Sequence, residues 1–286
     1  MSAAEFLRIG CVKYLNARPL IHGWPGPVRF DHPAVLCAQL ANGDLDVALV
    51  SSFEFLRNPI YRIVDDLSIS SAGPVYSVVV AHHGDISEVD EIELDPASET
   101  SVNLLRCLLA ELNLTPREVG NIDLQSVRPA GLQPVGYDGA KNISARRTGN
   151  IPMFPTARHA RLLIGDQAIR SRQAHAEQFR FWDLGEQWNK LVGLPFVYAL
   201  CLIRPEVRNY KSVAARLRKL RNENLADIDK LVAEEKEFDP DFSRRYYREN
   251  LRFSFGEKEK AGLMAFCSLC EKYGLLPKHE VELAVV

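Results

Sequence analysis

Four short polar turns in this sequence each follow an apolar, strand-like run and precede a helical pattern. They are KYLNARP at residues 13–19, VSSFE at 50–54, DPASETSV at 95–102 and IGDQA at 164–168. The N–H groups and the dipole at a helix N-terminus favour an anion there, and Ser or Thr hydroxyls add further donors. Because ligands of open α/β sheets collect beyond the carboxyl ends of the strands, we expect several of these turns to meet on one small acidic molecule.

The candidate binding residues on these turns carry a hydroxyl, a carboxylate or an unhindered backbone N–H. They are Ser51, Ser52, Thr100, Ser101, Gly165 and Asp166. The alternative is purely structural, because Ser52, Ser98 and Thr100 are also of the residue types that cap helices. For one turn alone the capping interpretation is favoured, whereas four similar turns in one chain favour a shared binding site.

Asn16 lies in the first turn, between an apolar run and the helix that Pro19 is expected to begin. An amide both donates and accepts hydrogen bonds, but it is not a base at neutral pH. The side chain either contacts a ligand or caps that helix by bonding its backbone. The residue types alone leave both interpretations open.

Motifs for nucleotide binding, zinc proteolysis and serine hydrolysis do not occur: the sequence lacks G-x-G-x-x-G, G-x-x-x-x-G-K-[ST], H-E-x-x-H and G-x-S-x-G. His82 and His83 follow an apolar run, where a solvated strand end is favoured over a metal site. Cys267 and Cys270 lie in an amphipathic helical pattern, which favours a buried pair over a metal or redox site. We therefore expect neither a metal nor an organic cofactor.

The composition is that of an ordinary soluble protein of 286 residues, with 47% hydrophobic residues and a formal net charge of -2. It lacks the basic excess of nucleic-acid-binding proteins, so small neutral or anionic metabolites are the expected partners. No apolar run reaches the roughly 20 residues that span a bilayer, and the N-terminal residues lack the apolar region of a signal peptide. With six scattered cysteines, we expect a cytoplasmic protein that binds neither nucleic acid nor membrane.

The elements that must position the turns alternate between strand and helix in the first 200 residues, which predicts an α/β fold with largely parallel strands. The charged, helical stretch 209–237 and two further helical patterns follow. Residues 126–159 hold many Gly and Pro and have no apolar periodicity, so they predict a long loop. Loops of this length are usually functional or disordered, and the sequence does not separate the two.

Seven blocks along nearly the whole chain resemble, in this order, the chorismate dehydratase family of menaquinone biosynthesis. The blocks are IGCVKYLNARPL, GDLDVALVSSFEFLRNP, SISSAGPVYSVVV, SETSVNLLRCLL, LLIGDQAI, DLGEQWNKLVGLPFVYAL and EKAGLMAFCSLCEKYGLL. The resemblance implies a two-lobed fold like that of type II periplasmic binding proteins, with the ligand in the cleft between the lobes. Lobe one would comprise residues 1–83 and 200–286, and lobe two residues 84–199.

The resemblance also implies a reaction, the cofactor-independent loss of water from the dicarboxylate chorismate to give 3-[(1-carboxyvinyl)oxy]benzoate in the futalosine route. It implies Asn16 and Ser77 as the catalytic residues. Because neither is a base, the substrate's own enolpyruvyl carboxylate would take the proton. Two alternatives are a non-catalytic small-anion-binding protein of the same fold and the related dihydroxynaphthoate synthase. The oligomeric state is not indicated.

Two features depart from the family pattern. Glu99 places a negative charge beside a predicted anion site, which weakens the case for Thr100 and Ser101 as carboxylate ligands unless its side chain points away. The loop at 126–159 is longer than expected, and it covers the cleft, contacts another subunit or has no role.

Overall fold

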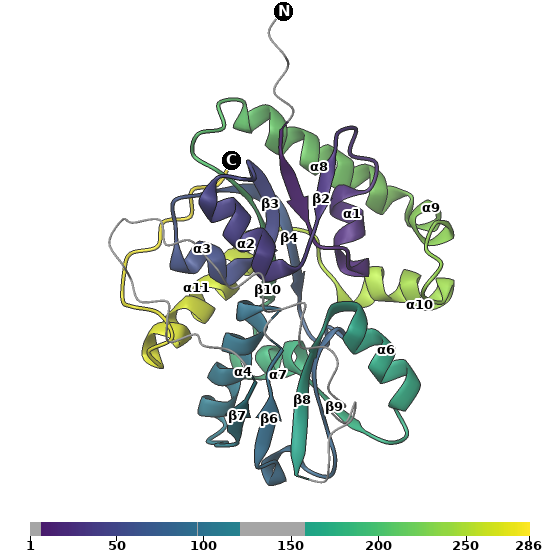
Figure 1. The fold of residues 1–286 in the computed structure, drawn as a ribbon, viewed down its shortest axis with the longest axis vertical. Coiled ribbons are helices and arrows are strands. Elements are labelled where there is room, and N and C mark those ends of the chain that lie inside the picture. The colour runs from purple at the N-terminus through teal and green to yellow at the C-terminus, as the bar shows by residue number, and fades with distance from the viewer. Residues whose placement is uncertain (1–6, 96, 121–157) are drawn as a thin grey trace, which may run out of the picture.

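The structure, a computed structural model, describes residues 7–95, 97–120 and 158–286. The strands of these residues form two separate five-stranded sheets. Figure 1 shows the two sheets one above the other along the long axis of the molecule. The loop expected at 126–159 lies almost wholly outside the described residues, and His159 begins a strand instead.

The first sheet has the strand order β2-β1-β3-β10-β4. Its strands are β1 (Ile9–Cys11), β2 (Val28–Phe30), β3 (Val47–Ser51), β4 (Arg62–Ser71) and β10 (Phe196–Ile203). The helices of this half of the molecule are α1 (Arg18–Ile21), α2 (Pro33–Asn42), α3 (Ser52–Arg57), α8 (Tyr210–Ala226), α9 (Ile228–Ala233), α10 (Pro240–Arg245) and α11 (Glu257–Lys272).

The second sheet has the strand order β7-β6-β8-β5-β9. Its strands are β5 (Val78–His82), β6 (Glu91–Glu93), β7 (Arg117–Val119), β8 (His159–Ile164) and β9 (Arg180–Asp183). The helices packed with it are α4 (Glu99–Glu111), α6 (Gly165–His175) and α7 (Leu184–Val192).

The prediction of largely parallel strands is wrong for half of the pairs. β1 and β6 run parallel to both of their neighbours, as the strand-helix alternation predicts. β10 and β5 run antiparallel to both of theirs. The reason is the topology, since the chain passes from one sheet into the other at β5 and returns at β10.

This pairing also moves the boundaries expected from the sequence. β5 pairs only within the second sheet, although residues 78–83 were expected in the first lobe. β10 pairs only within the first sheet, although residues 196–199 were expected in the second lobe. We therefore propose that the chain crosses between the lobes at 72–77 and 193–195.

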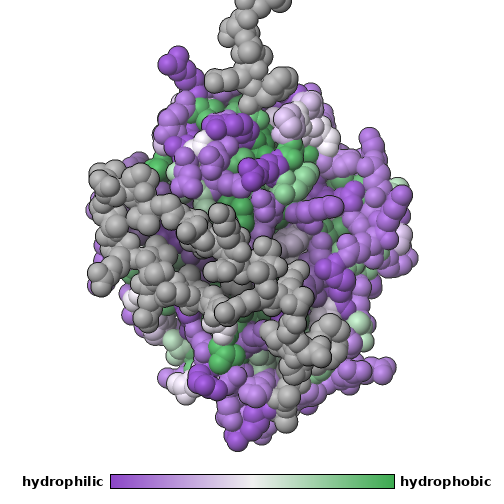
Figure 2. Space-filling view, viewed as in Figure 1, coloured by the Kyte–Doolittle hydropathy of each residue, from purple (hydrophilic) through white to green (hydrophobic). Residues whose placement is uncertain are grey.

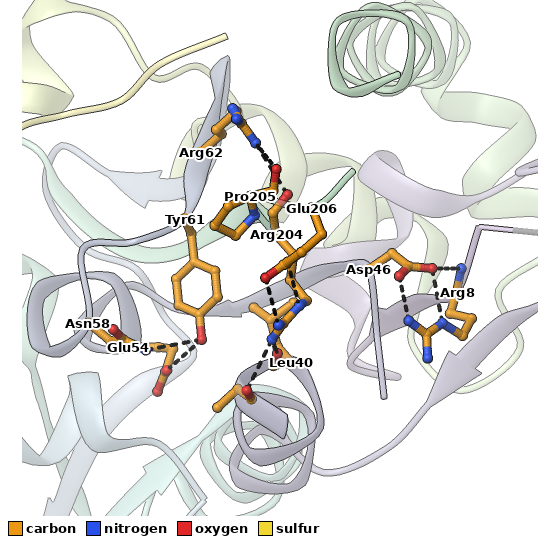
Figure 3. A network of polar contacts seen from close by, with 11 residues as sticks. Arg8, Leu40, Asp46, Glu54, Asn58, Tyr61, Arg62, Arg204, Pro205 and Glu206 are labelled. Atoms are coloured by element: carbon orange, nitrogen blue, oxygen red, sulfur yellow. Dashed lines mark hydrogen bonds and ion pairs between the residues drawn. The ribbon is translucent and has the colours of Figure 1, made fainter. Parts of the chain in front are cut away.

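The ends of α2 show how local sequence sets these elements. Pro33 occupies the first turn, where its missing N–H costs no hydrogen bond. Gly43 ends the helix at φ +84°, a conformation that side chains disfavour. The Arg204 guanidinium, from just after β10, donates to the carbonyl oxygens of Leu40 at 2.5 Å and Ala41 at 3.0 Å. Figure 3 shows this contact beside the ion pair of Arg8 with Asp46.

One hydrophobic core joins the two halves. The Trp188 ring on α7 is fully buried and lies 5.0 Å from the Phe196 ring on β10 and 6.1 Å from the Phe266 ring on α11. After α10 the chain makes a five-residue π-helix, Tyr246–Asn250, before α11 begins. There the Asn250 amide donates to the Pro74 carbonyl at 3.0 Å, so the C-terminal region packs on the crossing segment.

The surface is mainly hydrophilic on the face shown in Figure 2, with hydrophobic residues in small separate patches. Large exposed hydrophobic side chains lie on different elements, at Phe30, Ile60, Leu112, Leu191 and Val285. Among the described helices, none combines the length and the apolar character needed to span a bilayer.

Candidate functional site

A pocket with about 580 Å³ of empty space, part of which is open solvent at its mouth, is lined by residues from both sheets, at the ends of several strands. The first half of the molecule contributes the polar side chains of Tyr14, Asn16, Ser51 and Tyr198. The second half and the crossing segment contribute Ser77, Ser98, Ser101 and Gly165. Val12, Leu49, Ile69, Val75 and Ile164 supply much of the apolar lining. An apolar lining with a few convergent polar groups is typical of a site for a small molecule.

The four polar turns predicted from the sequence all reach this pocket. Asn16 comes from the first turn, Ser51 from the second, Ser101 from the third and Gly165 from the fourth. They meet because β1, β3, β6 and β8 each run toward the middle of the molecule, so the helix after each strand begins there. Ser77 joins them from the segment before β5.

Three of the predicted binding residues do not line the pocket, namely Ser52, Thr100 and Asp166. Thr100 is fully buried, and its Oγ1 accepts a bond from the Phe53 N–H at 3.0 Å and contacts the Ser51 hydroxyl. The Ser52 hydroxyl donates to the Val197 carbonyl at 2.7 Å. Thr100 therefore fixes the start of α4 against the start of α3, and Ser52 ties α3 to β10.

Asp166 holds the first turn in place instead of facing the pocket. Its Oδ1 accepts a bond from the Leu15 N–H at 2.9 Å. Burial raises the pKa of this carboxyl to about 6, against the hydrogen bond from Leu15 that lowers it. The Tyr247 hydroxyl donates to the Leu15 carbonyl at 3.0 Å, so both backbone groups of the residue before Asn16 are fixed.

Gly165 is required where the first and fourth turns touch. Its φ is +57°, and a Cβ at this position would lie 3.0 Å from the Tyr14 ring. The Gly165 N–H donates to the Ser77 carbonyl at 2.8 Å. The residue therefore packs Tyr14 and Ser77 against the start of α6 with no room for a side chain.

Asn16 does not cap a helix. The caps of the 3-10 turn Leu15–Ala17 and of α1 are Tyr14 and Ala17, and neither makes a side-chain capping bond. The Asn16 Oδ1 atom is buried and has no hydrogen-bond partner in the described part of the protein. Because a buried unpaired acceptor costs free energy, this atom marks a position where a ligand donor would fit.

Ser77 is completely buried beside the pocket, and its hydroxyl contacts a residue that the sequence did not indicate. The Tyr246 hydroxyl, from the π-helix, donates to Ser77 Oγ at 2.6 Å. Burial raises the pKa of the Tyr246 phenol far above its usual value, and contacts with Ser77 and Asn16 oppose this only in part. Tyr246 is therefore a neutral donor at any physiological pH.

Glu99 points away from the pocket, although it begins α4. Its carboxylate pairs with the Arg57 guanidinium, with 2.8 Å between Oε1 and Nη1. The same guanidinium also pairs with Glu54. The negative charge of Glu99, which the sequence places beside the predicted anion site, is thus paired with Arg57 on α3. It therefore gives no reason to exclude Ser101 as a carboxylate ligand.

The described lining of the pocket contains no Arg, Lys or His. The N-terminal ends of α3, α4 and α6 meet there, at Ser51, Ser98 and Gly165. Among the described residues, the groups at the pocket that could hold an anion are hydroxyls, backbone N–H groups and helix dipoles. Burial raises the pKa of Tyr14 to about 12 and that of Tyr198 well above its usual value, so both phenols stay neutral.

No group of three or more His, Cys, Asp or Glu residues that could hold a metal occurs within residues 7–95, 97–120 and 158–286. All six cysteines are buried and free. Cys107 and Cys270 approach to 3.9 Å between their sulfur atoms without a covalent bond.

Comparison with known proteins matches a family described as menaquinone biosynthesis to residues 7–134 and 143–272. A chorismate dehydratase from Thermus thermophilus is 29% identical over 290 residues, which cover 90% of this chain and 93% of that protein. An Archaeoglobus fulgidus protein of known crystal structure has a TM-score of 0.62 at 16% identity, covering 94% of this chain and 98% of its own.

The periplasmic aliphatic sulphonate binding protein SsuA from Escherichia coli has a TM-score of 0.57 at 14% identity, with 97% of this chain and 95% of that chain covered. At this level of identity the likeness shows the fold alone. It confirms the predicted two-lobed architecture of the periplasmic binding proteins, with the pocket between the lobes.

Proposed function

This chain belongs to the menaquinone biosynthesis family, and we propose that within it the protein is a chorismate dehydratase. The reaction would remove water from chorismate to give 3-[(1-carboxyvinyl)oxy]benzoate, as a step of the futalosine route in the cytoplasm. The observation that carries the proposal is the pocket in which Asn16 and Ser77 lie together among neutral polar groups. Six free cysteines agree with a reducing compartment.

Chorismate carries two carboxylates, and the pocket offers two separated positions for them. We assign one carboxylate to the Ser51, Ser98 and Ser101 hydroxyls, where the ends of α3 and α4 adjoin. The other would lie toward the start of α6, where the helix dipole favours negative charge, since the Gly165 N–H is already bonded to the Ser77 carbonyl. Donors fixed before the substrate binds need no reorganisation during the reaction, which is the largest single contribution in many enzymes.

The elimination breaks a ring C–H bond and the C–O bond of the adjacent hydroxyl. The C–H electron pair becomes a ring double bond, so the ring becomes aromatic. In the proposed reaction the substrate's enolpyruvyl carboxylate takes the proton, and the described lining of the pocket holds no side chain that is a base at neutral pH. The hydroxyl oxygen leaves with the C–O electron pair and takes up the proton from the enolpyruvyl carboxyl group, so that water is released and the carboxylate is restored.

Asn16 and Ser77 act on this departing hydroxyl in the proposed reaction. The buried Asn16 Oδ1 accepts the hydrogen bond of the substrate hydroxyl. The Ser77 hydroxyl donates to the same oxygen as negative charge develops on it. Neither residue changes its protonation state, so the proposal requires no metal or organic cofactor.

The direct test incubates purified protein with chorismate and follows the product by ultraviolet absorbance and mass spectrometry. Asn16→Asp is the sharpest variant, since it keeps the shape and the acceptor but adds a negative charge next to a dianion. Loss of a preorganised polar group costs roughly 10²-fold or more in turnover. Asn222→Asp, on the exposed face of α8, makes the same chemical change away from the pocket and should keep full activity.

Normal turnover by a folded Asn16→Asp protein would remove Asn16 from the mechanism. Chorismate binding without product from the wild type would favour the alternative of a non-catalytic binding protein, which the same fold also supports.

A further inference from the structure

Tyr246 lies in an unusual local conformation. It begins the π-helix Tyr246–Asn250, and single π-turns of this kind are frequent at functional sites. Its side chain is fully buried, and the ring stacks on Phe242 with centroids 5.7 Å apart and planes 11° from parallel. The ring is therefore held firmly, and so is the hydroxyl at its end.

The direction of the hydrogen bond at this hydroxyl is what gives it a role. Tyr246 donates to Ser77 Oγ at 2.6 Å, so Ser77 is the acceptor. The proton of the Ser77 hydroxyl itself is then free to point in another direction. Within the described residues no acceptor contacts it, and the pocket that Ser77 lines is the space open to it. The raised pKa of the phenol keeps Tyr246 protonated, so the phenol retains the proton that it donates to Ser77.

We propose that Tyr246 is a positioning residue, which fixes the rotation of the Ser77 hydroxyl so that its proton points at the departing hydroxyl of the substrate. The inference rests on the proposed function and deepens it. No proton moves from Tyr246, and no bond to it forms or breaks. In this role the residue acts by occupying one lone pair of Ser77 Oγ, and its hydroxyl also contacts Asn16.

The arrangement also joins the two halves of the molecule. Tyr246 comes from the C-terminal part of the first lobe, whereas Ser77 immediately precedes β5 of the second sheet. The hydrogen bond therefore ties the C-terminal part of the first lobe to the segment that leads into β5.

A double-mutant cycle with Tyr246→Phe and Ser77→Ala tests this directly. Tyr246→Phe keeps the ring stack and removes only the hydroxyl, and we expect kcat to fall roughly 10–100-fold with KM within about threefold. In the Ser77→Ala background the same substitution should change kcat less than about twofold, because the group through which Tyr246 acts is already gone.

Tyr61→Phe is the matched control. Tyr61 is also fully buried, and its hydroxyl donates to Glu54 at 3.3 Å, a contact that Figure 3 shows. Neither residue lines the pocket. Loss of this hydroxyl should leave kcat within about twofold of the wild type. Should Tyr246→Phe fail to fold, Tyr246→Met enters the same cycle, because a methionine side chain adapts to the space without a hydroxyl.

Suppose that the wild type converts chorismate and that the two substitutions lower kcat by factors that multiply in the double variant. This result would overturn the positioning role and leave the proposed function intact. An unchanged kcat in Tyr246→Phe would do the same. A wild type that does not convert chorismate would overturn the proposed function and, with it, this inference.

Discussion

Replacing Asp166 by Asn should stabilise the protein at neutral pH but not at pH 4. The Asp166 carboxylate is buried, and the one hydrogen bond that it accepts within the described residues comes from the Leu15 N–H. Burial raises the pKa of this carboxyl from 3.8 to about 6. Between these two values the folded protein binds more protons than the unfolded chain. Stability from this group is therefore full below about pH 4 and is lost as the pH rises through 6.

The size of the effect follows from the two pKa values. A difference from 3.8 to about 6 corresponds to roughly 3 kcal/mol at most, at 1.36 kcal/mol for each factor of ten. An amide at position 166 carries no charge and can still accept the bond from the Leu15 N–H. The variant should therefore gain up to this amount at pH 7.5 and differ little from the wild type at pH 4.

Urea denaturation of both proteins at the two pH values, followed by tryptophan fluorescence, measures the difference. The buried Trp188 makes the signal sensitive to loss of the core. Because other titrating groups are common to both proteins, their contributions cancel. A stability difference that is the same at pH 4 and pH 7.5, or a loss of stability at pH 7.5, would refute the assignment of a raised pKa to Asp166.

Three further outcomes are expected. Gly165→Ala places a Cβ 3.0 Å from the Tyr14 ring at a φ of +57°, so it should lower both melting temperature and chorismate turnover. Gly262→Ala places a Cβ 1.9 Å from the Pro195 carbonyl oxygen, and urea denaturation should show a loss of about 1–3 kcal/mol or more. Turnover should survive EDTA without added nicotinamide or flavin, and an activity lost in EDTA and restored by one metal would contradict the proposed chemistry.

The convergence of the four turns could be predicted from the sequence because it depends on a general rule. Strand, polar turn and helix N-terminus are recognisable locally, and strands of an α/β sheet bring their carboxyl ends to one edge. Asn16, Ser51, Ser101 and Gly165 therefore line one pocket, as that pattern predicts. Their roles in binding or catalysis remain predictions.

The direction of individual side chains could not be predicted in the same way. Thr100 and Ser101 are neighbours in one helical turn, yet only Ser101 reaches the pocket while Thr100 bonds to α3. Glu99 turns to Arg57, which is 42 positions away in the sequence. The direction of each of these side chains depends on how the N-terminal ends of α3 and α4 pack together. That packing produces no recognisable pattern in the sequence around either helix.

Tyr246 was missed for a different reason. In the stretch FSRRYYREN its spacing is that of a helix with a buried face, and a buried aromatic residue is usually part of the core. Only the π-turn and the return of the C-terminal region to the crossing segment bring its hydroxyl to Ser77. In the sequence, the one feature that sets this stretch apart is the pair of adjacent tyrosines, Tyr246 and Tyr247, shortly before Asn250.

The position of β10 in the first sheet governs the order in which a nascent chain can fold. β10 lies between β3 and β4, which do not pair with each other, so both strands have an open edge until residues 196–203 have left the ribosome. At a synthesis rate of about 5–20 residues per second, that delay lasts roughly 6–25 seconds after β4 is made. The second lobe, being contiguous, can fold during this interval, whereas a chain cut short before β10 would expose two unpaired strand edges and should aggregate.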